Sequence, residues 1–356
     1  MTDISRHTIY KDASLLDALH CLNDLSGRVM TLFVLDSEGR VEGSITDGDI
    51  RRALLDGGSL SDSVDIACHR DYRYVRAGSI DPLVLRESRE RGIKLLPALD
   101  GDNHLVSLVD LTRQHTVLPL RAVLMAGGRG ERLRPMTLTT PKPLLQIEGK
   151  AIIDYNVEAL AACGIDEIIV TTRYLAEQIH DHFAAPVAGV QVRCVTEDKP
   201  LGTIGAVASL WPDSHSGDTL VMNSDLLTTI SFEEMYLRHR SSKADVTIAV
   251  VPYQVSVPYA ILTLDNDDPD SVTAIEEKPS YSYYANAGIY IFSNALLSTL
   301  KAGEYCDATD LIQRAITDGR KVTYYPIKGT WIDVGSPVDF RQAAQLMRHH
   351  NSMSNS

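Results

Sequence analysis

Ala122-Val-Leu-Met-Ala-Gly-Gly-Arg-Gly-Glu-Arg-Leu-Arg-Pro135 is the most informative stretch of this chain, and Pro141-Lys142-Pro143 follows it closely. Its first residues are apolar and predict a buried strand, and the glycines that come next predict a tight turn. Such a turn brings backbone N–H groups close to a bound anion, because glycines place no side chain in the way. The stretch therefore predicts a phosphate-binding turn at the end of a strand.

The charged residues of this stretch extend the prediction from binding to chemistry. Gly127, Gly128 and Gly130 open the backbone, whereas Arg132 and Lys142 supply fixed positive charge. Positive charge beside a triphosphate stabilises a pyrophosphate group as it leaves. The P-loop pattern fits poorly because no Gly-Lys-Ser/Thr closes the turn, and the dinucleotide fingerprint fits poorly because it needs a ribose-binding acid after the next strand. The pattern indicates nucleotidyl transfer.

Together with Leu133, Pro135, Thr137 and Lys142-Pro143, the string resembles the sugar-1-phosphate nucleotidyltransferases, which make nucleotide-activated sugars. The resemblance implies that Arg132 and Lys142 are catalytic. It also implies that the loop beginning at Glu197 recognises the base, and a carboxylate there can accept from the N1–H and the exocyclic amine of guanine, which favours GTP. A carboxylate in a solvated turn is the alternative for Glu197. The implied nucleotide-binding residues are Ala126, Gly127, Gly128, Gly130, Glu197, Gly202 and Thr203.

Two aspartates and a sugar-phosphate pocket are also implied by the resemblance. Asp225 ends an apolar strand and Asp333 lies in a turn, and in the family such a pair holds the Mg²⁺ that bridges the phosphates. The family more often has glycine before the first aspartate, whereas this chain has Ser224. Helix capping is the alternative for each aspartate. The implied sugar-phosphate residues are Glu277, Lys278, Asn286 and Gly288.

The mechanism that this resemblance implies needs no catalytic histidine. A sugar 1-phosphate is already an anionic nucleophile, so catalysis reduces to positioning and to neutralising charge. The expected substrates are an NTP, with GTP favoured, and a hexose 1-phosphate.

The first third of the chain contains an internal repeat. The turns beginning at Asp36 and Asp100 align when shifted by about 64 positions, in a helix, strand, turn, strand, helix order that occurs twice. This segment resembles the paired CBS module, which implies an adenine nucleotide at the two strand-to-helix junctions. Helix N-capping without a ligand is the alternative, because Ser, Thr and Asp are favoured caps. The implied regulatory residues are Thr46, Asp49, Ser107 and Asp110.

Composition limits the classes of partner. The 356 residues carry a formal net charge of −13 without a long basic run, which argues against nucleic acid and anionic membranes. Five scattered cysteines support neither disulfides nor a zinc site. The sequence has no apolar run of membrane-spanning length and no signal-like segment. We therefore expect a cytoplasmic protein, and the CBS resemblance implies a homo-oligomer.

The predicted fold class is α/β, with an N-terminal CBS pair followed by a Rossmann-like, mostly parallel mixed-sheet nucleotidyltransferase domain. The expected boundaries are residues 1–117 for the regulatory CBS pair, 118–350 for the transferase and 351–356 for a disordered tail. This arrangement resembles the glucosamine-1-phosphate guanylyltransferases that supply GDP-sugars for legionaminic acid synthesis. Mannose-1-phosphate guanylyltransferase or another NDP-sugar pyrophosphorylase is the alternative in the same class. A catalytically silent adenylate-sensing protein is the alternative from another class.

Overall fold

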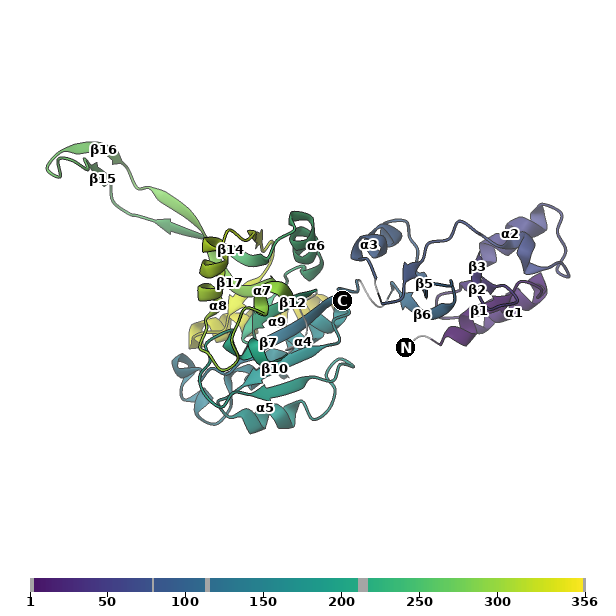
Figure 1. Cartoon of the computed structure of the whole chain (residues 1–356), viewed down its shortest axis with the longest axis horizontal. Coiled ribbons are helices and arrows are strands. Elements are labelled where there is room, and N and C mark those ends of the chain that lie inside the picture. The colour runs from purple at the N-terminus through teal and green to yellow at the C-terminus, as the bar shows by residue number, and fades with distance from the viewer. Residues whose placement is uncertain (1–2, 79, 113–115, 211–216, 355–356) are drawn as a thin grey trace. The chain divides into compact units, whose positions relative to one another are not determined.

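A computed structural model describes residues 3–78, 80–112, 116–210 and 217–354, with side chains in the last helix to residue 348 (Figure 1). The chain divides into two compact units, of which the first comprises Met1–Pro119 with Ala162–Ile165. The second comprises Leu120–Ala161 with Asp166–Ser356. The main division thus lies two residues after the expected end of the CBS pair at residue 117.

The first unit contains the predicted repeat. Its strands and helices are β1 (Thr8–Tyr10), α1 (Leu15–Asp24), β2 (Leu32–Leu35), β3 (Val41–Ile45), α2 (Asp47–Leu55), β4 (Val75–Arg76), α3 (Pro82–Glu90), β5 (Leu95–Leu99) and β6 (Leu105–Asp110). In one sheet β1 pairs parallel to β2, which pairs antiparallel to β3. In the other sheet β4 pairs parallel to β5, which pairs antiparallel to β6. A buried cluster of Phe33, Val41, Leu95 and Leu99 joins the two halves.

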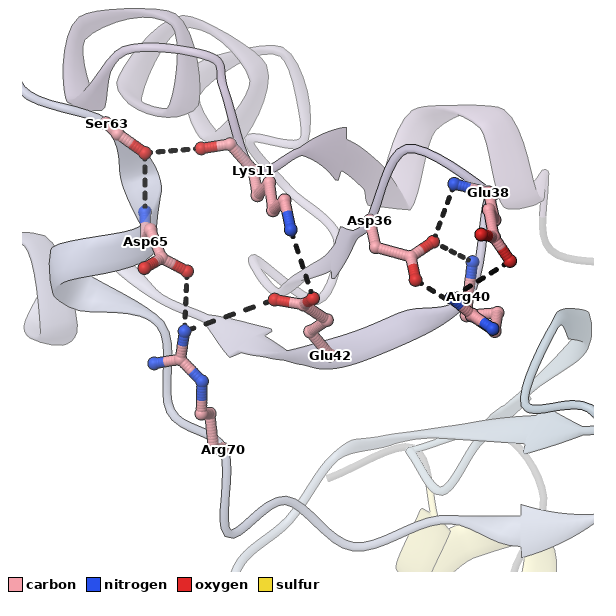
Figure 2. Close-up of polar contacts among 8 residues, drawn as sticks. All are labelled: Lys11, Asp36, Glu38, Arg40, Glu42, Ser63, Asp65 and Arg70. Atoms are coloured by element: carbon pink, nitrogen blue, oxygen red, sulfur yellow. Dashed lines mark hydrogen bonds and ion pairs between the residues drawn. The ribbon is translucent and has the colours of Figure 1, made fainter.

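The two hairpin turns use the same hydrogen bonds, which confirms the 64-residue spacing. Asp36 accepts from the backbone N–H groups of Glu38 and Arg40 at 2.8 and 2.9 Å, as Figure 2 shows. Asp100 accepts from the N–H groups of residues 102 and 104 at 2.9 and 2.8 Å. The hydrogen bonds from Arg40 also hold the pKa of Asp36 at about 2. A carboxylate at this position therefore shapes each hairpin turn.

The two junctions that follow these hairpins differ from each other. Thr46 is the N-cap of α2 and forms a capping box with Asp49, as the capping alternative predicts. The prediction of a helix directly after Asp110 is wrong. Leu111 and Thr112, the described residues that follow it, form a turn. Asp110 accepts from the backbone and hydroxyl of Thr112 at 2.9 and 2.6 Å, and this local pairing favours a turn over a helix.

The second unit is built on a seven-stranded mixed sheet in the order β11-β10-β7-β12-β17-β14-β18. Its strands are β7 (Leu120–Ala126), β10 (Ile168–Thr172), β11 (Arg193–Thr196), β12 (Asp218–Asn223), β14 (Val246–Ser256), β17 (Ser280–Ser293) and β18 (Val322–Pro326). Its helices are α4 (Ile152–Ala162), α5 (Ala176–His182), α6 (Phe232–Ser242), α7 (Asn294–Leu297), α8 (Ala308–Thr317) and α9 (Pro337–Ser354). Short pairs add β8 (Gln146–Ile147), β9 (Lys150–Ala151), β13 (Leu226–Thr228), β15 (Ile261–Leu264), β16 (Val272–Glu276) and β19 (Trp331–Asp333).

The sheet is parallel except at β17, which confirms the mostly parallel prediction. Strand β17 pairs antiparallel with both of its neighbours, β12 and β14. The centre of the sheet is completely buried, with Val123, Val221 and Phe292 in one cluster with Leu311 of α8. Central parallel strands that are covered by helices have continuous apolar sequences. The positions of these strands could therefore be predicted from the sequence.

Strands β14 and β17 continue past the sheet as a two-stranded ribbon. Their pairing runs to Ser256 opposite Ser280, and the β15–β16 hairpin lies beyond it (Figure 1). Side chains of the hairpin are largely exposed, including Leu262 at 52% and Ile275 at 69%. A two-stranded ribbon buries little apolar surface of its own.

The final helix extends into the segment that was expected to be a disordered tail. Helix α9 runs to Ser354, so residues 351–354, which the sequence analysis placed in a disordered tail, are helical here. Residues 355–356 lie outside the described residues. Among the described helices, none is long and apolar enough to cross a membrane.

Candidate active site

A cavity of about 660 Å³ lies where the loops after β7, β10 and β12 converge. These parallel strands end at the same edge of the sheet, which is where open α/β sheets bind ligands. The predicted residues that line the cavity are Ala126, Gly127, Gly128, Gly130, Arg132, Lys142, Glu197, Gly202, Thr203 and Asp225. The structure therefore brings the predicted nucleotide-binding and catalytic residues together.

The glycine turn is held against the segment that carries Lys142. Gly130 has a φ of 60°, and the hydroxyl of Thr137 donates to its carbonyl at 2.8 Å. A Cβ atom at Gly130 would lie 2.9 Å from Cγ2 of Thr137 and 3.1 Å from Cβ of Lys142. Both the backbone angle and the close approach therefore require glycine.

Lys142 joins the two predicted metal-binding carboxylates. Its side chain is only 10% exposed, and its Nζ pairs with Asp225 and, at 3.4 Å, with Asp333. Strand pairing explains why residues so distant in sequence meet here. Leu226 of β13 lies opposite Asp333 of β19, and the Val334 N–H donates to the Asp225 carbonyl at 3.2 Å. The carboxylates are thus placed by backbone register.

One oxygen of this pair has no partner of its own. Asp225 Oδ1 is buried and accepts no hydrogen bond among the described residues, although Oδ2 pairs with Lys142. Mg²⁺ is commonly held by one or two carboxylates while substrate phosphates and water fill its other positions. The described residues form no group of three or more His, Cys, Asp or Glu ligands. The donor set fits a magnesium ion shared with a nucleotide.

Arg132 reaches the same carboxylates from the glycine turn. Its guanidinium lies 3.9 Å from Asp333, and its side chain is 75% exposed. A Cβ atom at Gly335 would lie 2.9 Å from the Arg132 guanidinium, so glycine allows this close approach. Arg132 is therefore placed over the loop after β19 and remains accessible to a ligand.

Glu197 lies beside the glycine turn, half-buried. Its Oε2 accepts from the Leu201 N–H at 3.4 Å, and Oε1 lies 3.5 Å from the position of a Cβ at Gly127. Burial raises the pKa of Glu197, and the Leu201 hydrogen bond and the positive charge of Arg173 partly offset this. The Glu197 carboxylate is thus partly desolvated rather than fully exposed to solvent.

The four predicted sugar-phosphate residues separate into two pairs. Asn286 accepts from the Gly288 N–H at 3.0 Å, and a Cβ at Gly288 would lie 2.5 Å from the amide of Asn223, which lines the cavity. Glu277 and Lys278 follow β16 at the base of the β15–β16 hairpin, where both are exposed and neither lines the cavity. The structure places Gly288 of the first pair against the cavity residue Asn223, although neither Asn286 nor Gly288 lines the cavity itself, and it leaves the second pair on the ribbon.

Several polar residues of the cavity were not predicted from the sequence, among them Arg173, Tyr305 and Asp307. Arg173 directly follows β10, so its position after a parallel strand is a signal that could have identified it. Tyr305 and Asp307 lie in the loop before α8, and no sequence pattern marks them.

The first unit has a separate cavity of about 1280 Å³. Thr46 and Asp110 line it, whereas Asp49 and Ser107 do not. The Asp49 carboxylate accepts from the backbone and hydroxyl of Thr46 at 2.8 and 2.6 Å, which uses one of its oxygens for helix capping. Ser107 lies within β6, opposite Ala98. Two of the four predicted regulatory residues thus face this cavity.

The sheet, the glycine turn and the paired carboxylates together define an α/β domain with a candidate phosphate-binding site at the carboxyl ends of its strands. The family model described as nucleotidyl transferase matches residues 121–350, and the chain belongs to this family. The CBS domain model matches residues 2–56, which is the first of the two repeats.

Similar proteins include enzymes named as guanylyltransferases. A mannose-1-phosphate guanylyltransferase of Mycobacterium tuberculosis is 34% identical over 233 residues, which cover 64% of this chain and 64% of that protein. D-glycero-alpha-D-manno-heptose 1-phosphate guanylyltransferase of Aneurinibacillus thermoaerophilus is 29% identical over 234 residues, which cover 65% of this chain and all of that protein. The structure of HddC from Yersinia pseudotuberculosis complexed with GMP-PN matches with a TM-score of 0.50 and 26% identity, covering 64% of this chain and 99% of that one. The chain spans less than two thirds of the mannose-1-phosphate enzyme.

Proposed function

We propose that this protein transfers GMP from GTP to a hexose 1-phosphate, giving a GDP-sugar and pyrophosphate in a Mg²⁺-dependent reaction. The observation that carries the proposal is the position of Lys142 between Asp225 and Asp333 at the base of the glycine turn. Lys142 and Asp225 line the cavity, Asp333 pairs with Lys142, and a cation held in this way suits a substrate with adjacent phosphates. The cavity volume of about 660 Å³ lies within the usual range for small-molecule sites.

The chain's residues account for positioning and charge. The acceptor phosphate oxygen bonds to the α-phosphorus as the bond from the α-phosphorus to the bridging oxygen breaks, so pyrophosphate carries away the electron pair. No residue has to remove a proton, because the acceptor phosphate is already ionised. The N–H groups of the Gly127–Gly128 turn, Arg132 and Lys142 hold the phosphates in line. Asp225 and Asp333 would hold the magnesium ion, which neutralises negative charge on the phosphates.

Glu197 supports guanine as the base. A carboxylate accepts two hydrogen bonds from the N1–H and the exocyclic amine of guanine, and uracil and thymine cannot donate both. Names of similar proteins point the same way, since two of them are guanylyltransferases and a third was solved with GMP-PN. UTP and dTTP are the alternative donors.

Glucosamine 1-phosphate is the proposed acceptor, for a GDP-sugar that supplies legionaminic acid synthesis. This proposal rests on the fusion of a CBS module to the transferase domain and on the sequence resemblance that this fusion carries. Mannose 1-phosphate is the alternative, in line with the name of the Mycobacterium relative.

Pyrophosphate release tests the proposal across five NTPs and four sugar 1-phosphates, with and without Mg²⁺. The acceptors are the 1-phosphates of glucosamine, N-acetylglucosamine, mannose and glucose. We expect turnover with GTP and glucosamine 1-phosphate, and a loss of turnover in Lys142→Met but not in the exposed control Lys301→Met. Turnover with another pair would keep the chemistry and replace the substrates. If a folded protein released no pyrophosphate with any combination of NTP and sugar 1-phosphate, the adenylate-sensing alternative would be favoured.

A regulatory role is proposed for the cavity of the first unit. It brings Thr46 and Asp110 together with the basic side chains of Arg28, Arg91 and Lys94, a set that suits the phosphates and ribose of an adenine nucleotide. Any effect of this nucleotide on the transferase requires different affinities for two states of the protein.

A further inference from the structure

The residue that follows β10 is an arginine, and strand register places it between the glycine turn and Glu197. The last residues of β7, β10 and β11 are register partners in three adjacent parallel strands, with β10 in the middle. Gly127, Arg173 and Glu197 follow these partners directly. The Glu197 N–H donates to the Thr172 carbonyl at 2.8 Å, which continues the pairing by one residue. The three loops therefore begin side by side at one edge of the sheet.

The same three residues approach one another closely. A Cβ atom at Gly127 would lie 3.5 Å from Glu197 Oε1 and 3.7 Å from Arg173 Cβ, so these two atoms are at most 7.2 Å apart, the sum of the two distances. All three residues line the transferase cavity. Arg173 also lines a neighbouring cavity of about 640 Å³, so its half-buried side chain is accessible to a ligand. Arg173 and Glu197 thus border the same part of the transferase cavity.

The guanidinium of Arg173 has hydrogen-bonding capacity that the described part of the chain does not use. Within that part, it donates no hydrogen bond to another residue and forms no ion pair. Arginine carries five N–H donors and no acceptor, so only acceptor atoms can satisfy it. Its charge acts on Glu197 at longer range, where it opposes the rise in pKa that burial causes. The donors of Arg173 therefore remain available to a ligand that lies beside Glu197.

The acceptor atoms of a nucleotide lie on its phosphates, its ribose and its base. A phosphate beside Arg173 would also lie close to the carboxylate of Glu197, and the two negative charges would repel each other. A base carries no charge, and guanine combines donors for a carboxylate with acceptors for an arginine on neighbouring atoms. The juxtaposition of Arg173 and Glu197 therefore favours the base over the phosphates.

We propose that Arg173 determines base specificity by donating hydrogen bonds to O6 and N7 of guanine, while Glu197 accepts from the N1–H and the exocyclic amine. The inference rests on the proposed function and adds a second contact to its base-binding site. O6 and N7 are acceptors on one edge of the base, and arginine commonly contacts both at once. Adenine has an amino donor in place of O6, so it leaves the arginine without that acceptor. Uracil and thymine have no N7.

The nucleotides GTP, 7-deaza-GTP and ITP separate the two contacts. In 7-deaza-GTP a C–H group replaces N7 and removes an acceptor for Arg173, whereas ITP lacks the exocyclic amine and removes a donor to Glu197. Affinities are measured by calorimetry with Mg²⁺ in the wild type, Arg173→Met and the control Arg193→Met, which changes an exposed arginine of β11 that does not line the cavity. We expect the wild type to bind 7-deaza-GTP about tenfold more weakly than GTP, the effect of one charge-assisted hydrogen bond.

The variants assign this difference to a residue. Arg173→Met should bind GTP about tenfold or more weakly, and its affinities for GTP and 7-deaza-GTP should agree within about twofold. Its ratio between GTP and ITP should equal that of the wild type, because that ratio depends on Glu197. Arg193→Met should keep both ratios. The comparison of the two nucleotides in the wild type needs no variant, so it tests the N7 contact even if Arg173→Met fails to fold.

Four results would overturn the inference. The wild type would bind GTP and 7-deaza-GTP equally, or Arg173→Met would keep the full preference for GTP over 7-deaza-GTP. A uniform loss of affinity for GTP, ATP and UTP in Arg173→Met would assign the residue to the phosphates. A change confined to the ratio between GTP and ITP would mean that Arg173 only orients Glu197.

Pyrophosphate release with the same nucleotides keeps the two proposals separate. An N7 preference that depends on Arg173 in calorimetry would support the inference even if no sugar 1-phosphate gave turnover and the proposed function failed. Turnover with GTP and 7-deaza-GTP at equal kcat/KM, together with equal affinities, would overturn the inference while leaving guanylyl transfer intact. A wild type that binds UTP in preference to GTP would overturn both.

Discussion

Replacing Lys142 with methionine should weaken the fold and stop the reaction, and Mg²⁺ should reverse only the first effect. Methionine keeps much of the volume of the lysine side chain but removes the charge that separates Asp225 from Asp333. Breaking a fully buried ion pair costs about 3–5 kcal/mol. The carboxylates are 23% and 39% exposed, so solvent screening reduces the expected loss to about 2 kcal/mol.

The assay is thermal unfolding with and without Mg²⁺, followed by pyrophosphate release on the same samples. A loss of about 2 kcal/mol lowers Tm by about 4–8 °C in a unit of this size. Mg²⁺ at a hundred times its Kd restores about 2.7 kcal/mol, because it replaces the missing charge between the carboxylates. Turnover should fall by about 10²–10³-fold and stay low in Mg²⁺, since the phosphates still lack the lysine.

Three results would refute this reasoning. Wild-type turnover in Lys142→Met would remove Lys142 from the reaction. An unchanged Tm would mean that the ion pairs contribute nothing to stability. An equal Mg²⁺-induced rise of Tm in wild type and variant would mean that lysine and metal do not share the carboxylates.

Three further changes test other parts of the two units. Gly335→Ala should displace the Arg132 guanidinium, which lies 2.9 Å from the new Cβ, and lower kcat by about tenfold with Tm nearly unchanged; unaltered kinetics would show that Arg132 needs no such position. Burial raises the pKa of Glu197, so the free energy of unfolding should fall as the pH rises from the ordinary glutamate pKa through the raised pKa of the folded state. KM for GTP should rise as the pH falls through the same range, because protonated Glu197 accepts fewer hydrogen bonds. Glu197→Gln should abolish the pH dependence of KM, measured from initial rates, and a retained dependence would exclude Glu197 as its source. Asp110→Ala should weaken ATP or AMP binding to the first unit by about tenfold in calorimetry, and unchanged affinity would remove Asp110 from that site.

The parts of the fold that follow from local pattern could be predicted from the sequence. The apolar run of β7 and its glycine turn fixed the centre of the sheet and the phosphate-binding end, because burial and positive φ angles restrict which residues occur there. The hairpin turns at Asp36 and Asp100 could be aligned because each depends on hydrogen bonds within five residues.

The remainder depends on contacts between distant residues. Asp307 contacts Thr203 across 104 positions, and no local pattern encodes that distance. The residues of β15 and β16 resemble those of ordinary strands, yet both strands are largely exposed in the described structure. Their sequence alone does not reveal this exposure. The capping residues Thr46 and Asp49 satisfy the same pattern with or without a ligand, so the sequence could not separate these two roles.

The pairing of β13 with β19 gives the site an order of assembly. Asp225 lies near the middle of the second unit, whereas Asp333 belongs to its last strand and is synthesised later. At about 5–20 residues per second, the ribosome delivers the second carboxylate several seconds after the first. A nascent chain can complete the sheet through β18 and still lack one of the two carboxylates proposed to bind the metal. Chains that terminate before β19 are therefore expected to retain the glycine turn and Glu197 but to lack the proposed activity.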